Sequence, residues 1–150
     1  MYFPRTRALR EEFEYTQQYV ANYLNCKRTT YESWETGHII LPLNIANKLA
    51  TLYDVPISYV LGTDTIRFVE NPIKEIDYDF MINKFNELKK YNNDSFEDIS
   101  RYIDTNKSTT YRYFSGKIKI PTDKLILLCE YYHINIDEVC GTNNKHKVNL

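Results

Sequence analysis

The chain of 150 residues is 43% hydrophobic and carries 19 basic against 20 acidic residues. This composition is typical of a soluble globular protein, and it excludes both a disordered chain and a strongly basic one. No stretch has the length and apolarity of a membrane span, and the N-terminus lacks the apolar core of a signal peptide. We therefore expect a cytoplasmic protein with no membrane partner.

The chain is an internal duplication. Its four glycines form two equally spaced pairs, Gly37 with Gly62 and Gly116 with Gly141. Residues 16–63 align without a gap with residues 95–142, and identical positions include Tyr23/Tyr102, Thr30/Thr109, Pro42/Pro121, Leu49/Leu128 and Val60/Val139. The period is too long for a solenoid repeat, which spans about 20 to 50 residues. We predict two tandem domains, residues 1–66 and 79–144, with a linker at 67–78 and a tail at 145–150.

Each copy is predicted to be all-α, because apolar residues recur at helical spacing and no long alternating pattern appears. Helices are expected at residues 5–14, 16–24, 27–36, 43–53 and 56–61, and again at 79–91, 95–103, 106–115, 122–132 and 135–140. The glycines follow the third and fifth helix of each copy, where a left-handed residue closes the last turn. Ser95 with Asp98 has the pattern of a capping box and Asn106 that of an N-cap, whereas Lys27 cannot cap.

The second and third helices of each copy have the pattern of a helix-turn-helix. Asn25 and Asp104 stand where a tight turn requires a positive φ, and asparagine and aspartate tolerate that conformation best after glycine. Ala21 and Ser100 are small enough for the two helices to cross closely. The inward anchors of the third helix are expected to be Tyr31 with Trp34, and Thr110 with Tyr113, so its other face is left exposed for reading DNA.

The segment TQQYVANYLNCKRTTYESWETG, residues 16–37, resembles the helix-turn-helix of the Xre family, the Cro and lambda repressor type of DNA-binding regulators. The resemblance extends through Pro42 and NIANKLATLYDVPISYVLG, and so covers nearly the whole first copy. The second copy, from SFEDISRYIDTNKSTTYRYFSGKIKIP to INIDEVCG, looks like the same fold with weaker motifs. The resemblance implies two tandem five-helix domains of the lambda repressor type, which bind double-stranded DNA in a bacterial or phage repressor.

The resemblance also implies a set of DNA contacts. Gln17 is expected to bond a phosphate, and base edges in the major groove are expected to meet Lys27, Arg28, Thr29 and Ser33. Arg28 is the strongest candidate, because a guanidinium can donate two hydrogen bonds to guanine. The matching positions of the second copy are Asn106, Lys107, Ser108 and Arg112, with Lys117 and Lys119 placed for backbone contacts.

The copies differ at two features that the family implies. An arginine of the first helix often pairs with the glutamate of Trp-Glu-x-Gly, which here predicts a buried pair of Arg10 with Glu35. The second copy has Lys89 and Phe114 at these positions, and Phe96 in place of Gln17, so one phosphate donor is missing. Basic residues nevertheless gather between Arg101 and Lys119, which favours a polyanion site in the second copy over a merely solvated face.

The sequence features bear on three classes of function. The first is a sequence-specific DNA-binding transcriptional regulator, acting as a single chain or as a homodimer. The second is a protein-interaction or dimerisation module in which one or both copies no longer bind DNA, favoured by the near-neutral charge and by Phe96. An enzyme has little support, because the chain lacks a glycine-rich phosphate loop, a nucleophile elbow and a histidine cluster.

Other noteworthy side chains have simpler interpretations. The three cysteines, Cys26, Cys129 and Cys140, are expected to be reduced and buried, and Cys140 with His146 is a weak metal signal. We predict no metal and no cofactor. Trp34 is expected in the core. Surface packing is favoured over phosphate contacts for most of the exposed tyrosines, which are Tyr19, Tyr23, Tyr102 and Tyr111.

Overall fold

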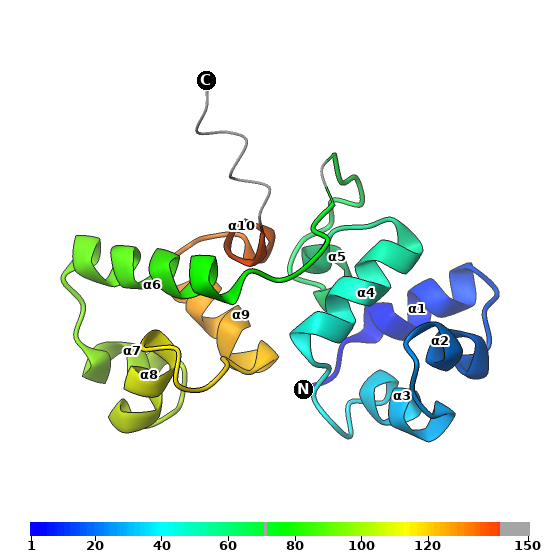
Figure 1. Ribbon diagram of the computed structural model, residues 1–150, viewed down its shortest axis with the longest axis horizontal. Coiled ribbons are helices and arrows are strands. Elements are labelled where there is room, and N and C mark those ends of the chain that lie inside the picture. The colour runs from blue at the N-terminus through cyan, green and yellow to red at the C-terminus, as the bar shows by residue number, and fades with distance from the viewer. Residues whose placement is uncertain (71, 142–150) are drawn as a thin grey trace. The chain divides into compact units, whose positions relative to one another are not determined.

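The computed structural model describes residues 1–70 and 72–141 (Figure 1). Every secondary-structure element assigned within these residues is a helix, which confirms the expected all-α fold. The chain divides into two compact units, Met1–Lys74 and a second that begins at Glu75. Each unit has its own core, and each is described separately below.

The described part of the first unit contains five helices: α1 (Pro4–Glu12), α2 (Gln17–Tyr23), α3 (Arg28–Glu35), α4 (Leu43–Tyr53) and α5 (Ile57–Leu61). Local chemistry explains their ends. A proline opens α1, where its missing N–H costs no hydrogen bond. The Thr16 side chain accepts from the Tyr19 N–H and caps α2, and left-handed Asp54 ends α4. The core is apolar and includes Leu9, Val20, Tyr31, Leu41, Leu49 and Val60.

The described part of the second unit also contains five helices: α6 (Tyr78–Asn92), α7 (Phe96–Tyr102), α8 (Lys107–Phe114), α9 (Thr122–Tyr131) and α10 (Ile136–Cys140). Asp77 caps α6 through the Phe80 N–H, and left-handed Asn93 ends it. Buried side chains from all five helices fill the core, among them Met81, Phe85, Ile99, Thr110, Leu125, Leu128 and Ile136. All ten helices lie within one or two residues of their expected bounds.

Three of the four glycines that follow helices adopt the expected left-handed conformation, and Gly141 does not. Gly37, Gly62 and Gly116 have φ of +76°, +74° and +76°, as expected for left-handed closing residues. Gly141 does not, because its φ of −114° and ψ of 153° are extended. The end of α10 is satisfied in another way, since the Cys140 carbonyl accepts a hydrogen bond from the Asp77 N–H at the start of α6 (3.0 Å). A left-handed turn is therefore not needed there.

The expected caps of the second unit form, with one change. Ser95 accepts from the Asp98 N–H (3.1 Å), and Asn106 accepts from the Thr109 N–H (2.7 Å). In a capping box the carboxylate would reach back to the Ser95 N–H. Here the Ser95 hydroxyl donates to the Asp98 carboxylate instead, over 2.8 Å.

We predict that Gly37→Ala destabilises the first unit more than Gly62→Ala. Both positions have a positive φ, which costs a residue with a Cβ about 1–2 kcal/mol. A Cβ at Gly37 would also lie 2.9 Å from the Cβ of Tyr2 and 3.0 Å from its Cα, whereas nothing lies within 4 Å at Gly62. Chemical denaturation of the two variants checks this, and equal losses would show that Tyr2 moves aside without cost.

Residues 63–70 and 72–74 follow α5 and make contacts with the rest of the first unit. Arg5 stacks on Tyr59, with 4.2 Å between its Cζ and the ring centroid, and donates to the carbonyl of Asp64. Arg67 pairs with Glu12 (2.9 Å), and the Lys74 carbonyl accepts from the Asn47 side chain (3.2 Å). Within the expected linker, residues 67–78, Arg67 and Lys74 thus contact the first unit, and Asp77 belongs to the cap of α6.

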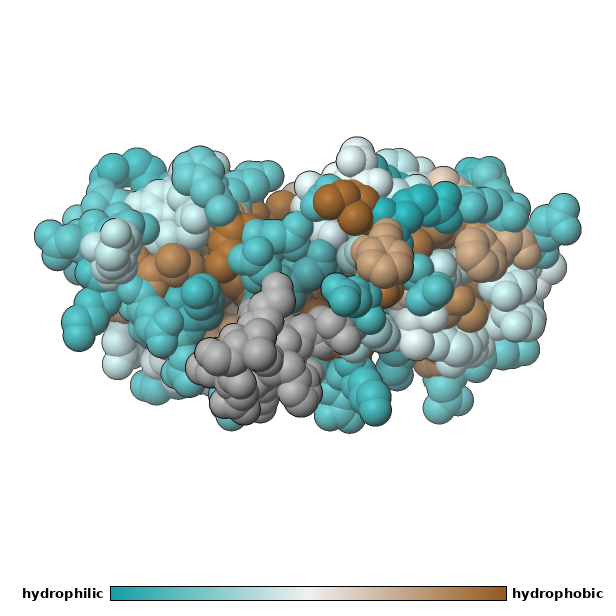
Figure 2. Space-filling model, turned by 90° about the horizontal axis from the view of Figure 1, so that it is seen from above, coloured by the Kyte–Doolittle hydropathy of each residue, from teal (hydrophilic) through white to brown (hydrophobic). Residues whose placement is uncertain are grey.

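The described surface is mainly hydrophilic on the face shown in Figure 2, with scattered apolar side chains. Phe68 is 75% exposed, more than Ile66 at 59%, the other exposed large hydrophobic side chain between α5 and α6 in the described residues. We predict that limited proteolysis with chymotrypsin cuts after Phe68 and leaves both halves folded, because Phe68 is exposed and lies outside the helices of both units. If no protease-resistant fragment the size of one unit appears, or if the cut chain unfolds in a single transition, the two units are not separable domains.

Candidate nucleic-acid interface

A tight turn joins α2 to α3 in the first unit. Asn25 has a φ of +56°, as expected, and the Cys26 N–H donates to the Ala21 carbonyl over 2.9 Å. Ala21 is fully buried, so no side chain separates the two helices at this point. The turn fixes the direction of α3 relative to α2, as a helix-turn-helix requires.

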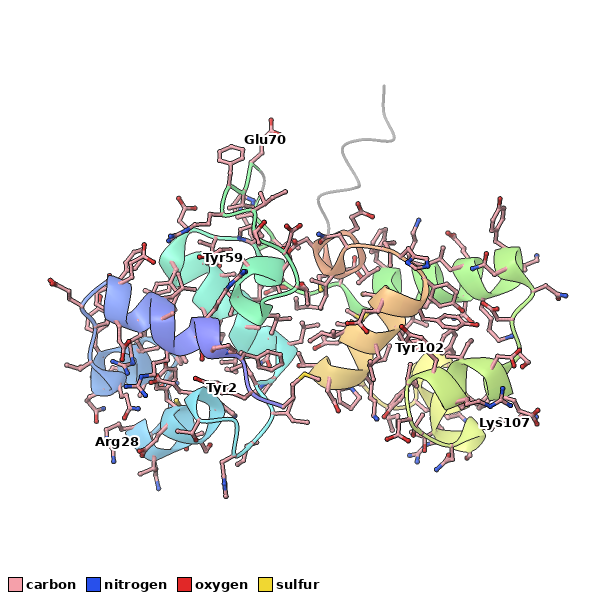
Figure 3. The ribbon with its side chains drawn as sticks, turned by 180° about the vertical axis from the view of Figure 1, so that it is seen from behind. Tyr2, Arg28, Tyr59, Glu70, Tyr102 and Lys107 are labelled. Carbon is pink, nitrogen blue, oxygen red and sulfur yellow. The ribbon has the colours of Figure 1, made fainter. Side chains whose placement is uncertain are left out.

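The start of α3 is exposed. Lys27, Arg28 and Thr29 are all exposed, and Figure 3 labels Arg28 at this end of the helix. Lys27 is the N-cap residue and makes no side-chain cap bond, so its ammonium is not used by the helix. Ser33, one turn on, is half-buried, and its hydroxyl donates to the Thr30 carbonyl (2.6 Å). Of the four expected base-reading residues, three are therefore exposed and one is half-buried.

The inward face of α3 differs from the expectation at one position. Tyr31 is fully buried, but its partner in the core is Glu35, which is 3% exposed, while Trp34 is only half-buried. A helix has 3.6 residues per turn, so the fourth residue after Tyr31 lies nearer its direction than the third. The prediction of a core Trp34 was therefore wrong.

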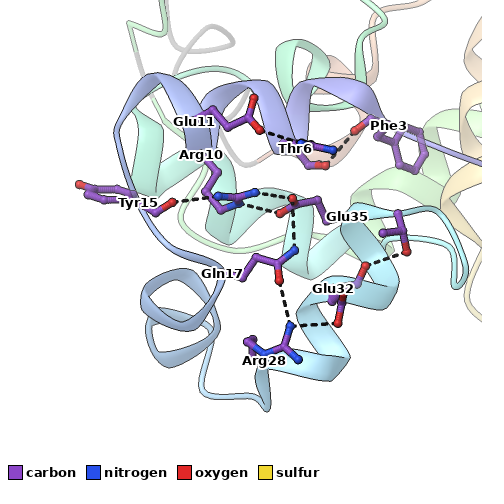
Figure 4. A network of polar contacts seen from close by, with 11 residues as sticks. Phe3, Thr6, Arg10, Glu11, Tyr15, Gln17, Arg28, Glu32 and Glu35 are labelled. Atoms are coloured by element: carbon purple, nitrogen blue, oxygen red, sulfur yellow. Dashed lines mark hydrogen bonds and ion pairs between the residues drawn. The ribbon is translucent and has the colours of Figure 1, made fainter.

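Glu35 forms the expected ion pair with Arg10 of α1 (Figure 4). Arg10 donates from Nε to Oε2 (2.9 Å) and from Nη2 to Oε1 (2.7 Å), and its Nη1 donates to the Tyr15 carbonyl (3.0 Å). Burial of Glu35 opposes its charge, but the hydrogen bonds from Arg10 hold the pKa of the carboxyl below its usual value. The hydrogen bond to Glu35 also raises the pKa of Arg10. The pair locks α1 to α3.

Gln17 extends this pair towards the exposed face. Its Nε2 lies 3.5 Å from the Glu35 carboxylate, and its Oε1 accepts from Nη1 of Arg28 over 3.0 Å. The same nitrogen of Arg28 donates to Glu32 one turn along α3, also over 3.0 Å. Gln17, expected only as a phosphate donor, is thus half-buried and engaged within the protein. These contacts orient Arg28 before any ligand binds.

The second unit repeats the turn with different contacts. Asp104 has a φ of +55°, and the Thr105 N–H donates to the Ser100 carbonyl (3.0 Å). Where Ala21 gives plain close contact, the buried hydroxyls of Ser100 and Thr110 form a hydrogen bond between α7 and α8 (2.6 Å). Thr110 and Tyr113 are both buried, as expected for the anchors of α8.

The expected contact residues of the second unit are all exposed. They are Asn106, Lys107, Ser108, Arg112, Lys117 and Lys119. The side-chain oxygen of Asn106, Oδ1, caps α8, so the side-chain amide hydrogens are what stays available for a ligand. Lys107, labelled in Figure 3, lies 3.6 Å from Glu97. The two later lysines lie over tyrosine rings, Lys117 5.8 Å from Tyr111 and Lys119 4.6 Å from Tyr78.

An aromatic group replaces the polar network in this unit. Phe96 packs edge-on against Phe114 and Tyr111, with ring centroids 5.6 and 5.7 Å apart. The Lys89 ammonium lies 4.3 Å from the centroid of the Phe96 ring. Lys89, Phe96 and Phe114 stand at the aligned positions of Arg10, Gln17 and Glu35. The second unit therefore holds the same helices together by apolar and cation–π contacts.

Comparison with known families agrees with this geometry in the first unit. Residues 7–60 match the family described as Helix-turn-helix. The match begins in α1 and ends in α5, so it lies wholly within the first unit. The chain matches no curated protein and no solved structure.

The helix-turn-helix domain of the first unit is of a kind that serves DNA-binding regulators, which are generally not enzymes. Among the described residues, no helix combines the length and the apolarity that a bilayer span requires. No group of three or more metal-ligating side chains is present in residues 1–70 and 72–141, and His146 lies outside them.

The cysteines differ from one another in burial. Cys129 and Cys140 are buried, and burial raises the pKa of the Cys129 thiol to about 12. Cys26 was expected to be buried and is only half-buried, because it lies in the turn between α2 and α3. The exposed tyrosines, Tyr19, Tyr23, Tyr102 and Tyr111, are between 44% and 50% exposed.

Two residues of these surfaces were missed in the sequence. Glu32 bonds Arg28, and Glu97 lies beside Lys107, so these two of the expected reading cations each have a carboxylate partner. The first pair has the i, i+4 spacing of helical ion pairs, which is a signal the sequence contains. The second joins two helices, and no local pattern indicates it.

Proposed function

We propose that the first unit is a sequence-specific reader of double-stranded DNA in a transcriptional regulator, with α3 in the major groove. One observation carries this proposal: Arg28 stands exposed at the start of α3 while Gln17 and Glu32 hold its guanidinium in place. A pre-oriented arginine can donate two parallel hydrogen bonds to guanine, and little side-chain freedom is lost on binding. Lys27 and Thr29 flank it and complete the reading surface.

We propose that the second unit also binds DNA, through α8. Its support is the exposure of Lys107, Arg112, Lys117 and Lys119 on and just after this helix. The two units differ at every reading position, so a single chain should prefer a site with two unlike halves. A two-fold symmetric dimer would instead prefer a palindrome. A regulator of this kind acts in the cytoplasm, where we place the protein.

A second candidate function applies mainly to the second unit, as a protein-interaction or dimerisation module. Phe96 favours it, because the side chain that replaces Gln17, the expected phosphate donor, is packed into an aromatic group. A ring in that place cannot bond a phosphate. Under this alternative the second unit would bring two chains together, and only α3 of each chain would read DNA.

Selection from random double-stranded DNA, followed by mobility-shift titration at several salt concentrations, tests both candidates. A reader enriches a defined motif, and the symmetry and spacing of that motif show how many helices read it. One asymmetric motif with two halves supports two readers in one chain. A palindrome supports a dimer with one reader per chain, and the absence of any enriched site at low salt would refute sequence-specific binding.

A further inference from the structure

The exposed face of α3 carries one carboxylate, that of Glu32, beside the arginine expected to read DNA. Such a group near phosphates weakens binding to every sequence by charge repulsion. The pair of Arg28 and Glu32 is not buried, since their side chains are 45% and 44% exposed, so it contributes little to folding. Its position suggests a role in binding rather than in stability.

The geometry of Arg28 shows what that role is. Two acceptors, Oε1 of Gln17 and Oε2 of Glu32, lie 3.0 Å from Nη1, which has two hydrogens to donate. Within residues 1–70 and 72–141, the Arg28 side chain makes these two hydrogen bonds, and both are from Nη1. The fork of a guanidinium has a second edge, formed by Nε and Nη2, with two parallel hydrogens. That edge matches the O6 and N7 acceptors of guanine.

We propose that Glu32 is a specificity-determining residue of the first unit. It occupies Nη1 so that Arg28 presents its Nε and Nη2 edge to a guanine, and it neutralises Arg28 so that the arginine gains little by turning to a phosphate. Loss of Glu32 then strengthens binding to all DNA and weakens the choice between bases. This inference rests on the proposed reading of DNA by α3.

The second unit lacks this arrangement, which confines the expected effect to one half of the site. Lys107 stands at the position of Arg28, and Tyr111 at that of Glu32. The carboxylate near Lys107 comes from Glu97 of α7, at 3.6 Å, and an ammonium has no second edge for a guanine. Preferences read by α8 should therefore not depend on Glu32.

The test is Glu32→Gln, measured by selection and by titration of the selected site and of random DNA. The preference for guanine at one base pair should fall about tenfold. Binding to random DNA should tighten, and the slope of log K against log salt should steepen by about one, because Arg28 becomes available to a phosphate. The midpoint of thermal unfolding should stay near that of the wild type, since an exposed pair is removed.

Two controls separate this effect from a general change of charge. Glu12→Gln removes the same charge from the pair with Arg67, which has a similar distance (2.9 Å) and similar exposure, and should leave base preference unchanged. In the Arg28→Ala background, Glu32→Gln should not lower the guanine preference further, because its target is gone. It should still raise affinity, since it removes a carboxylate that Arg28→Ala leaves unpaired.

Three results would overturn the inference. If the wild type selects a site and Glu32→Gln keeps its guanine preference, Glu32 does not orient Arg28. If Glu32→Gln loses a preference for cytosine at a neighbouring pair instead, Glu32 contacts a base itself. If the wild type enriches no site at all, the proposed function fails and this inference fails with it, and the wild-type selection alone distinguishes this case from the other two.

Discussion

Replacing Glu35 with alanine is expected to lower the free energy of unfolding of the first unit by about 3–5 kcal/mol. The carboxylate is 3% exposed and takes two hydrogen bonds from Arg10, which is itself only 14% exposed. Its removal leaves the guanidinium charge buried without a partner, and that cost exceeds the value of the contact itself. Urea denaturation measures the loss, and a change below about 1 kcal/mol would mean that the pair is hydrated in solution.

Two further variants identify the cause. Glu11→Ala removes the carboxylate of the exposed pair with Arg7 on α1 and should have a small effect. The double change Arg10→Met with Glu35→Leu should recover much of the loss, because an apolar pair leaves no buried charge. The second unit uses a related solution, with Phe114 at the position of Glu35.

Stability should depend on pH through the same carboxyl group. The folded-state pKa of Glu35 is lowered, so its contribution is fully present above its unfolded pKa of about 4.3. It is lost as pH falls through the lower folded value. The difference in stability between the wild type and Glu35→Ala should therefore shrink below about pH 4. A difference that stays constant into acid would show that the pKa is not lowered.

Arg28→Ala and Arg112→Ala are expected to relax base preference in different halves of the selected site, each by about 1–3 kcal/mol. Arg28 begins α3 and Arg112 lies on the exposed face of α8, and each guanidinium can pair with a guanine. Mobility shifts against a panel of single-base variants of the site measure the loss position by position. The exposed lysines of α4 and α6, Lys48 and Lys90, provide controls whose removal should leave every preference intact.

The two arginines also test the second unit by itself. If Arg112→Ala and Lys107→Ala leave both affinity and the salt slope unchanged, α8 does not read DNA, and dimerisation or partner binding becomes its better assignment. The oligomeric state of the full chain, measured by analytical ultracentrifugation with and without the selected site, then separates these two roles. If Arg112→Ala relaxes base preference in the same half of the site as Arg28→Ala, the two units do not read separate halves.

Most of the architecture could be predicted because its causes are local. Helical periodicity placed all ten helices, and the positive φ of Asn25 and Asp104 followed from the few residue types that tolerate it. The exposed positions of α3 and α8 were also recognisable, since a helix with one apolar face leaves the other to solvent. The match of residues 7–60 to the helix-turn-helix family agrees with that reading of the first copy.

Only the tertiary structure decided how distant side chains use one another. The extended Gly141, the burial of Glu35 in place of Trp34, and the aromatic group around Phe96 each depend on a neighbour from another helix. Gln17 carries a contact from the buried pair to Arg28 across three helices, which no spacing in the sequence indicates. The sequence by itself determined the helices and their exposed faces, because these follow from residues near in the chain. The partners of each charged side chain came from packing between helices, because they depend on distances in space.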